Sequence, residues 1–308
     1  MKRIVINSNL SIEEAFSNYI IIKSSEGLAD KTLECYRNHF KCISNYMDTT
    51  KLFSQLTQSD LQQMIIDMRN ARLSSNSIAS YIRVLRAFLS WANREGISEI
   101  SIPAYKAEET IKDTYSDEEL LLLLRKPNLN NCSFIEYRTW VIICFMLNCG
   151  ARAATVRNIT IQDIDLSNGL ITYRHNKNKR VQSIPLCSQM ISILKEYLHF
   201  RDGEPTDYLF CTEYGDMLTE QGLRSSIRRY NASRGVIKTS IHMFRHTFAK
   251  KFLIDGSGDA FTLQRILGHS TLEMTRHYCN IYNVDISKRY DSFSPLQNMS
   301  KSKRITMR

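Results

Sequence analysis

The hydrophobic pattern of this chain changes its period twice, and this change constrains the fold more than any other feature. In the first hundred residues apolar side chains recur at helical spacing, most clearly over 77–93. Over 159–186 they alternate instead, with a turn signal at Asn168-Gly169 and an edge-strand signal at Pro185. Helical segments then return, with predicted starts near Ser188, Thr219, Ser240, Asp259 and Thr271. The sequence therefore predicts a mainly α fold with a small antiparallel β-sheet.

Breaks in the pattern predict two domains. Polar breaks divide the first hundred residues into a four-helix module, in which Asp30 is the predicted N-cap of one helix. Periodicity is lost between Glu99 and Thr114, a stretch that contains Pro103, and a capping box at Ser116-Asp-Glu-Glu starts the next helix. We expect an N-terminal helical domain over 1–100, a linker over 101–114, a second domain over 115–290 and a C-terminal tail over 291–308.

The charge of the chain favours an acidic partner. The 308 residues carry a net charge of +10, with a pI near 9.2. Before residue 113 there are 14 Lys and Arg against 12 Asp and Glu, and from there on 27 against 19. The second domain thus carries most of the attraction for nucleic acid or a membrane surface. Nucleic acid is favoured, because no segment reads as a basic amphipathic helix with aromatic anchors.

Other composition signals exclude several protein classes. The eight cysteines lack the paired spacing that a zinc site requires, so free intracellular thiols are expected. The N-terminus has no sustained apolar segment, and the apolar stretch over 141–147 is too short to span a bilayer. No nucleotide-binding or metal motif is found. We expect a cytoplasmic protein without membrane anchor, metal or cofactor.

Ionisable residues gather near the C-terminal end. Four of the seven histidines lie between residues 242 and 277, together with Arg245 and Tyr278. His242 and Arg245 stand three apart, so a helix that begins at Ser240 places both on one face, where they could meet one ligand. An isolated pair of this kind is more often structural, as a helix-terminal histidine beside a surface ion pair.

Three further sequence signatures favour a functional role for His242 and Arg245 over a structural one. Gly150-Ala-Arg152 follows a buried-looking helix over 139–148, Lys177 lies in a loop between two predicted strands, and Leu267-Gly-His269 precedes Tyr278 by nine residues. In this order and spacing the residues resemble the phage integrase or tyrosine recombinase family, which includes Xer-type recombinases, over nearly the whole chain. The resemblance implies a two-domain DNA-breaking-rejoining fold, with a helical, SAM-like core-binding domain before an α+β catalytic domain.

The chemistry of a phosphodiester explains why these residue types occur together. Arg152 and Arg245 are expected to neutralise the non-bridging oxygens, since guanidinium forks bind phosphate through two hydrogen bonds. Tyr278 is the expected nucleophile, and His242 the candidate base that takes its proton. Lys177 is the expected general acid toward the leaving 5′ oxygen. The energy of the broken bond is then kept in the phosphotyrosine ester.

Some of these residue assignments leave alternatives open. An ungapped match to the family's Lys-Gly-x-Lys-x-Arg-x-x-Pro stretch selects Lys177, whereas a slip along that pattern selects Lys179. Either lysine could instead contact the DNA backbone. His269 is expected to donate to a phosphate oxygen, or else to pack at the Gly268 turn. The family usually has Glu or Asp three residues after the first arginine, and Thr155 stands there. Two other histidines are expected to be structural, His246 and His277.

The resemblance also implies partners. The family exchanges strands through a Holliday junction within a tetramer on two DNA sites with paired half-sites. Residues 284–296 correspond to the segment that docks on a neighbouring subunit, unless they pack in cis. Accessory DNA-bending proteins are a partner class that the sequence leaves open. The arginines of the 77–93 helix, Arg83 and Arg86, either face DNA or belong to a solvated surface.

We therefore expect a site-specific tyrosine recombinase that integrates and excises a mobile genetic element by transposition-like exchange. A host dimer resolvase of the Xer type is the alternative within the family, and departures at 148–155 and 175–180 from the form usual in host enzymes favour the mobile element. A type IB topoisomerase and a DNA-binding protein with a decayed site are the alternatives outside it. Thr155 is the only support for the decayed site.

Overall fold

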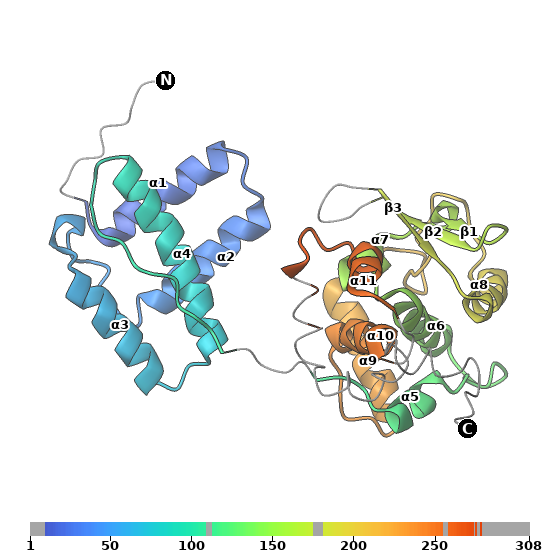
Figure 1. Ribbon diagram of the computed structural model, residues 1–308. Helices are drawn as coiled ribbons and strands as arrows, with labels where there is room; N and C mark the ends of the chain where they lie inside the picture. The colour runs from blue at the N-terminus through green and yellow to red at the C-terminus, as the bar shows by residue number, and fades with distance from the viewer. Residues whose placement is uncertain are drawn as a thin grey trace, which may run out of the picture. The chain divides into compact units, whose positions relative to one another are not determined.

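A computed structural model gives the fold and describes residues 10–108, 113–174, 181–254, 258–273, 275 and 278. The chain divides into two compact units, Met1–Thr110 and Ile111–Arg308 (Figure 1). The division falls within the stretch that the sequence predicts as the linker. The finer domain bounds stay predictions.

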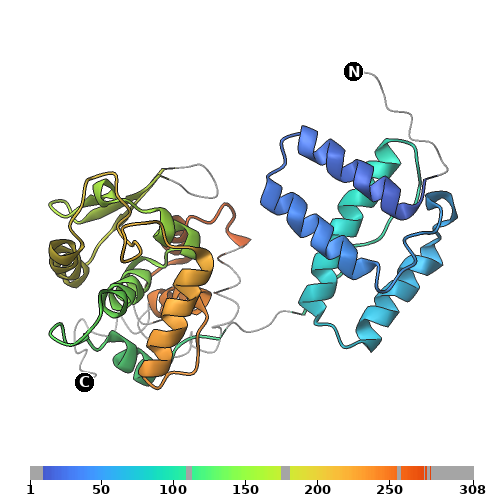
Figure 2. The ribbon, with the colours of Figure 1, turned by 180° about the vertical axis from the view of Figure 1, so that it is seen from behind.

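The first unit is a helical module built around one aromatic core (Figure 2, blue to blue-green). Phe88 is fully buried at its centre, with Phe16 and Phe53 packed edge-on against its ring at 5.3 and 5.5 Å. Asp30 is the first residue of its helix rather than the N-cap, which is Ala29. There the carboxylate still favours the helix, because it lies at the positive end of the helix dipole. The helices are α1 (Ile12–Ser25), α2 (Asp30–Ile43), α3 (Gln58–Asn70) and α4 (Ser75–Arg94), with a 3-10 turn η1 (Phe53–Gln55).

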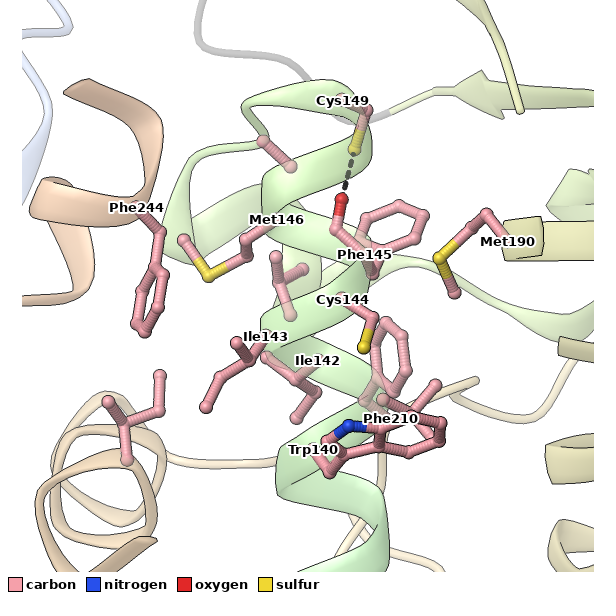
Figure 3. Close-up of a cluster of buried hydrophobic side chains, with 14 of the residues drawn as sticks. Trp140, Ile142, Ile143, Cys144, Phe145, Met146, Cys149, Met190, Phe210 and Phe244 are labelled. Atoms are coloured by element: carbon pink, nitrogen blue, oxygen red, sulfur yellow. Dashed lines mark hydrogen bonds between the residues drawn. The ribbon is translucent and has the colours of Figure 1, made fainter. Parts of the chain in front are cut away.

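The second unit is organised around α6 (Phe134–Cys149), a helix with buried residues on every side. Figure 3 shows its side chains pointing outward in several directions, toward Met190 on one side and Phe244 on another. The helix ends at Gly150, whose left-handed backbone closes the last turn. The capping box predicted at Ser116 and Glu119 is present and starts α5 (Asp117–Leu124).

A three-stranded antiparallel sheet lies at the end of this unit away from α5 (Figure 1). Its order is β1 (Ile164–Asp165), β2 (Leu170–Tyr173), β3 (Gln182–Pro185), so the edge position predicted for Pro185 is confirmed. The alternation predicted to begin at Ile159 is wrong as a strand, because a 3-10 turn η2 (Ile161–Asp163) occupies it. Asp163 causes this turn by accepting hydrogen bonds from Thr160 N and Oγ1, both at 2.9 Å.

The remaining helices confirm four of the predicted starts within one residue. They are α7 (Ala153–Asn158), α8 (Ser188–Arg201), α9 (Glu220–Ser233), α10 (Ile241–Ile254) and α11 (Ala260–Leu267). The start predicted near Thr271 falls where the chain is described only in part. The mainly helical class with a small antiparallel sheet is confirmed. Within the described residues, no helix is both long and apolar enough to cross a membrane.

Candidate active site

Arg245 is the buried centre of the candidate site. Its side chain projects from α10, is 6 % exposed, and donates through Nη1 to the Gly150 carbonyl at 2.7 Å and through Nη2 to the Leu267 carbonyl at 2.9 Å. Burial lowers the pKa of Arg245 to about 10, with Arg152 as the second cause, so it stays charged at neutral pH. The two carbonyls tie α10 to the ends of α6 and α11 and fix the guanidinium in place.

Gly150 is required at this point by both its backbone and its surroundings. Its φ of +60° is left-handed, and a Cβ there would lie 2.6 Å from Phe248 Cδ1 and 2.7 Å from Leu267 Cδ2. Any side chain would therefore require Phe248, Leu267 or the backbone of Gly150 to shift. This explains a glycine two residues before Arg152.

Arg152 lies at the N-cap of α7, partly buried beside the same site. In the described part of the chain no hydrogen bond or ion pair is found for its guanidinium. Desolvation lowers the pKa of Arg152, whereas the nearby Tyr278 raises it. Thr155, at the position of the usual acid, is buried and offers no carboxylate. Among the described residues, no carboxylate therefore pairs with the guanidinium of Arg152.

His269 follows the Gly268 turn and contacts Arg245. Arg245 Nη2 lies 2.8 Å from His269 Nε2, and Nδ1 lies 2.8 Å from Thr275 Oγ1. A guanidinium can only donate, so Nε2 accepts and the ring proton sits on Nδ1, facing Thr275. Burial, then Arg245 and Arg152, lower the pKa of His269 to about 4. Donation from His269 to a phosphate would require one of these bonds to rearrange, and it stays a prediction.

Tyr278 brings its phenol to these groups from the end of the described chain. The side chain is 5 % exposed and its ring stacks on His269, with 6.1 Å between centroids and an interplanar angle of 6°. Burial raises the pKa of Tyr278, whereas Arg245 and Arg152 lower it in part. Arg152 and Arg245 are the two arginines expected to clamp the phosphate, and the phenol is therefore close enough for all three groups to influence one another.

The histidine that contacts the Tyr278 hydroxyl is one that the sequence predicts to be structural. His246 Nδ1 lies 2.9 Å from the Tyr278 hydroxyl, whereas His242, one helical turn earlier on α10, is exposed. The His-x-x-Arg-His run holds both histidines, but which of them meets the phenol depends on how Tyr278 packs against α10. The spacing of the two histidines along the sequence does not determine this packing. The role predicted for His242 as base stays a prediction.

His242 lines a basic cleft beside the site. The cleft, of about 370 Å³, lies between α9 and the start of α10 and is also lined by Arg224 and Arg228. Arg224 pairs with Glu220 at 2.9 Å, and both side chains are exposed. Desolvation, Arg224 and Arg245 lower the pKa of His242. Exposed ion pairs contribute little stability, so a phosphate could replace Glu220 at small cost.

The loop predicted to carry the general acid is described only at its base. Lys177 and its alternative Lys179 lie outside the described residues, as do His277 and residues 284–296. At the base, Gln182 of β3 donates through Nε2 to the Ile266 carbonyl at 3.0 Å and to the Arg265 carbonyl. One end of the loop is thus anchored to the end of α11, next to His269.

Two known protein families match the two parts of this chain. The model of the Phage integrase family matches residues 116–283, which include the five described candidate residues. The model of the Phage integrase N-terminal SAM-like domain matches residues 14–96.

The similarity to known proteins and solved structures extends over most of the chain. The tyrosine recombinase XerD of Staphylococcus haemolyticus is 28 % identical over 297 residues, covering 92 % of this chain and 99 % of that protein. The Tn1549 transposon integrase in complex with a circular intermediate DNA has a TM-score of 0.72 at 16 % identity, over 92 % of this chain and 100 % of the other. The lambda integrase tetramer bound to a Holliday junction has a TM-score of 0.71 at 17 % identity, over 90 % and 79 %.

Proposed function

Because this chain belongs to the phage integrase family, we propose that it is a site-specific tyrosine recombinase that cleaves and rejoins DNA through a 3′-phosphotyrosyl bond to Tyr278. One observation carries the proposal. The buried Tyr278 phenol shares its surroundings with the guanidinium groups of Arg152 and Arg245. Among the described contacts of these arginines there is no carboxylate. Such a site attracts an anion and places a nucleophile beside it.

Each group of the site has one role in the proposed cleavage reaction. The Tyr278 oxygen attacks the scissile phosphorus while Arg152 and Arg245 neutralise its non-bridging oxygens. The bond to the 5′ oxygen breaks, and Lys177 is the proposed donor of the proton to that oxygen. His269 holds Arg245 in place and is proposed to reach the phosphate. The proton acceptor is one of two histidines, His242 as the sequence predicts or His246 as the contact favours.

Duplex DNA and further copies of the chain are the proposed partners. The cleft lined by Arg224 and Arg228 adjoins the site and suits a phosphate backbone, so binding should weaken strongly with salt. A lambda integrase forms a tetramer on a Holliday junction, and we propose the same assembly here. We also propose a cytoplasmic location, which fits a DNA substrate and the free cysteines of the described residues.

Two biological roles fit this chemistry. Departures from the host-enzyme motifs, such as Thr155, favour integration and excision of a mobile element. The 28 % identity with XerD over 92 % of the chain supports the second candidate, resolution of chromosome or plasmid dimers. The DNA substrate distinguishes them: an element integrase joins the ends of the element that carries its gene, whereas a resolvase acts on a fixed host site.

A recombination assay tests the proposed function. Duplexes that the purified protein selects from a random pool, or from DNA that flanks its gene, are placed as two copies on one supercoiled plasmid. We expect deletion or inversion between the two copies, together with Holliday junction intermediates. Relaxation without any exchange would instead show a type IB topoisomerase. Binding without cleavage, exchange or relaxation would show a decayed enzyme.

A further inference from the structure

His246 makes a close side-chain contact to the nucleophilic oxygen. Its Nδ1 lies 2.9 Å from the Tyr278 hydroxyl, and the two ring centroids are 5.6 Å apart with a 46° angle between the planes. His246 projects from α10 immediately after Arg245. The backbone bonds of Arg245 hold this helix against the ends of α6 and α11. The position of the His246 imidazole beside the phenol is thus set by α10, a helix that these hydrogen bonds hold in place.

The other groups near the phenol are poorly suited to take its proton. The guanidinium groups of Arg152 and Arg245 have no acceptor atom. His269 stacks parallel to the Tyr278 ring and uses both nitrogens elsewhere, Nε2 with Arg245 and Nδ1 with Thr275. His242 is an exposed residue that lines the basic cleft. His246 combines a basic nitrogen with hydrogen-bond distance to the Tyr278 hydroxyl.

The buried phenol needs such a partner if it is to react. Burial raises the pKa of Tyr278, and the two arginines offset this only in part. The hydroxyl therefore keeps its proton at neutral pH until the bond to phosphorus begins to form. A neutral imidazole is a suitable acceptor at that moment, because an unperturbed imidazole can bind and release a proton near neutral pH.

We infer that His246, not His242, is the general base of the reaction proposed above, on which this inference rests. In cleavage the Tyr278 proton passes to His246 Nδ1 while the bond from the Tyr278 oxygen to phosphorus forms. The bond from phosphorus to the 5′ oxygen breaks, and that oxygen takes a proton from the proposed acid Lys177. In rejoining, a 5′ hydroxyl attacks phosphorus and gives its proton back to Lys177, the phosphotyrosine bond breaks, and His246 returns its proton to the Tyr278 oxygen.

Two substitutions separate proton transfer from positioning. His246→Asn keeps a polar atom close to the place of Nδ1 but cannot hold a proton, whereas His246→Ala removes the contact. Single-turnover formation of the covalent complex is measured on a nicked suicide duplex. We expect both variants to bind DNA normally and to cleave about 10²–10³-fold more slowly, in the range of general base catalysis. His199→Asn, on the exposed face of α8, is the control and should cleave at the normal rate.

A more acidic nucleophile supplies the decisive test. Tyr278 is replaced by difluorotyrosine, whose phenol ionises without help, in the normal, His246→Asn and His242→Asn backgrounds. Rescue of His246→Asn by about 10-fold or more, with none in the normal background, is expected for a missing base. Rescue of His242→Asn but not of His246→Asn would overturn the inference in favour of His242. No rescue of either, or normal cleavage by His246→Ala, would also overturn it.

These outcomes are distinct from failure of the proposed function. If the unmodified protein forms no covalent complex on any selected duplex, the recombinase proposal itself fails. If it forms the complex and His246→Ala forms it equally fast, only the role of His246 is wrong. Thermal unfolding of each variant shows whether a slower rate reflects loss of folding.

Discussion

Arg245 and His269 share a hydrogen bond of 2.8 Å that assigns the histidine tautomer, because the guanidinium can only donate to Nε2. The ring must stay neutral to accept, and its pKa is lowered to about 4 from an ordinary value of 6.5, first by burial and then by Arg245 and Arg152. Between these two values the unfolded chain binds a proton that the folded chain does not. Acidification therefore favours unfolding in this window.

We predict that lowering the pH from 6.5 to 4 destabilises the protein through His269, with an upper limit of about 3 kcal/mol. His269→Gln should lose this component, so its free energy of unfolding should depend less on pH than that of the unmodified protein. Urea unfolding at several pH values measures both. His199→Gln serves as the control and should keep the full dependence. Equal pH dependence in the His269 variant would contradict the assigned bond.

Gly150→Ala should be far more damaging than the same change at another left-handed glycine. Gly150 and Gly235 have φ of +60° and +74°, so alanine costs about 1–2 kcal/mol of backbone strain at either position. At Gly150 the added Cβ also meets Phe248 and Leu267, whereas at Gly235 it meets nothing within 4 Å. We expect an extra loss of about 1–3 kcal/mol for Gly150→Ala, together with loss of cleavage. Equal destabilisation by both variants would contradict the packing described around Arg245.

The sequence predicts much of this site because its signals are local. A glycine that ends a buried helix, followed two residues later by Arg152, and the spacing of His242 and Arg245 on one helix can all be recognised from neighbouring residues. The contact between His246 and Tyr278 depends on how distant segments pack, so spacing along α10 could not reveal it. Likewise, alternating isoleucines at 159 and 161 look like a strand, although the side chain of Asp163 closes a 3-10 turn there.

The two arginines of the clamp should differ in what they contribute to folding. Arg152→Lys and Arg245→Lys should each lose at least about 10²-fold in cleavage while binding DNA nearly normally, because an ammonium cannot replace a planar fork. Arg245→Lys should also lose about 1–3 kcal/mol of stability with its two carbonyl bonds, whereas Arg152→Lys should not. Covalent-complex assays, DNA-binding titrations and urea unfolding measure these quantities, with Arg229→Lys as a surface control.

A methylphosphonate at the scissile position removes one oxygen charge and should partly restore cleavage by either clamp variant. If both variants lose binding as much as rate, and the neutral phosphate rescues neither, the two arginines are ordinary backbone contacts.

Lys177→Ala should cleave a substrate with sulfur at the scissile 5′ position far better than ordinary DNA, because a thiolate leaves without a proton. Lys179→Ala is the matched control from the same loop and should show no such preference. Single-turnover rates on the two substrates give the ratio for each variant. Equal defects on both substrates would make Lys177 a backbone contact, and a sulfur preference in Lys179→Ala alone would move the acid to that residue.

The central claim is that Tyr278 forms the covalent bond to DNA, and peptide mass spectrometry of the trapped complex tests it most directly. The unmodified protein is incubated with a nicked suicide duplex, digested with protease and nuclease, and searched for a tyrosine that carries a nucleotide. We predict the adduct on Tyr278, its absence in Tyr278→Phe despite normal DNA binding, and its persistence in Tyr214→Phe, which alters an exposed phenol. An adduct on any other tyrosine, or any covalent complex formed by Tyr278→Phe, would contradict the account.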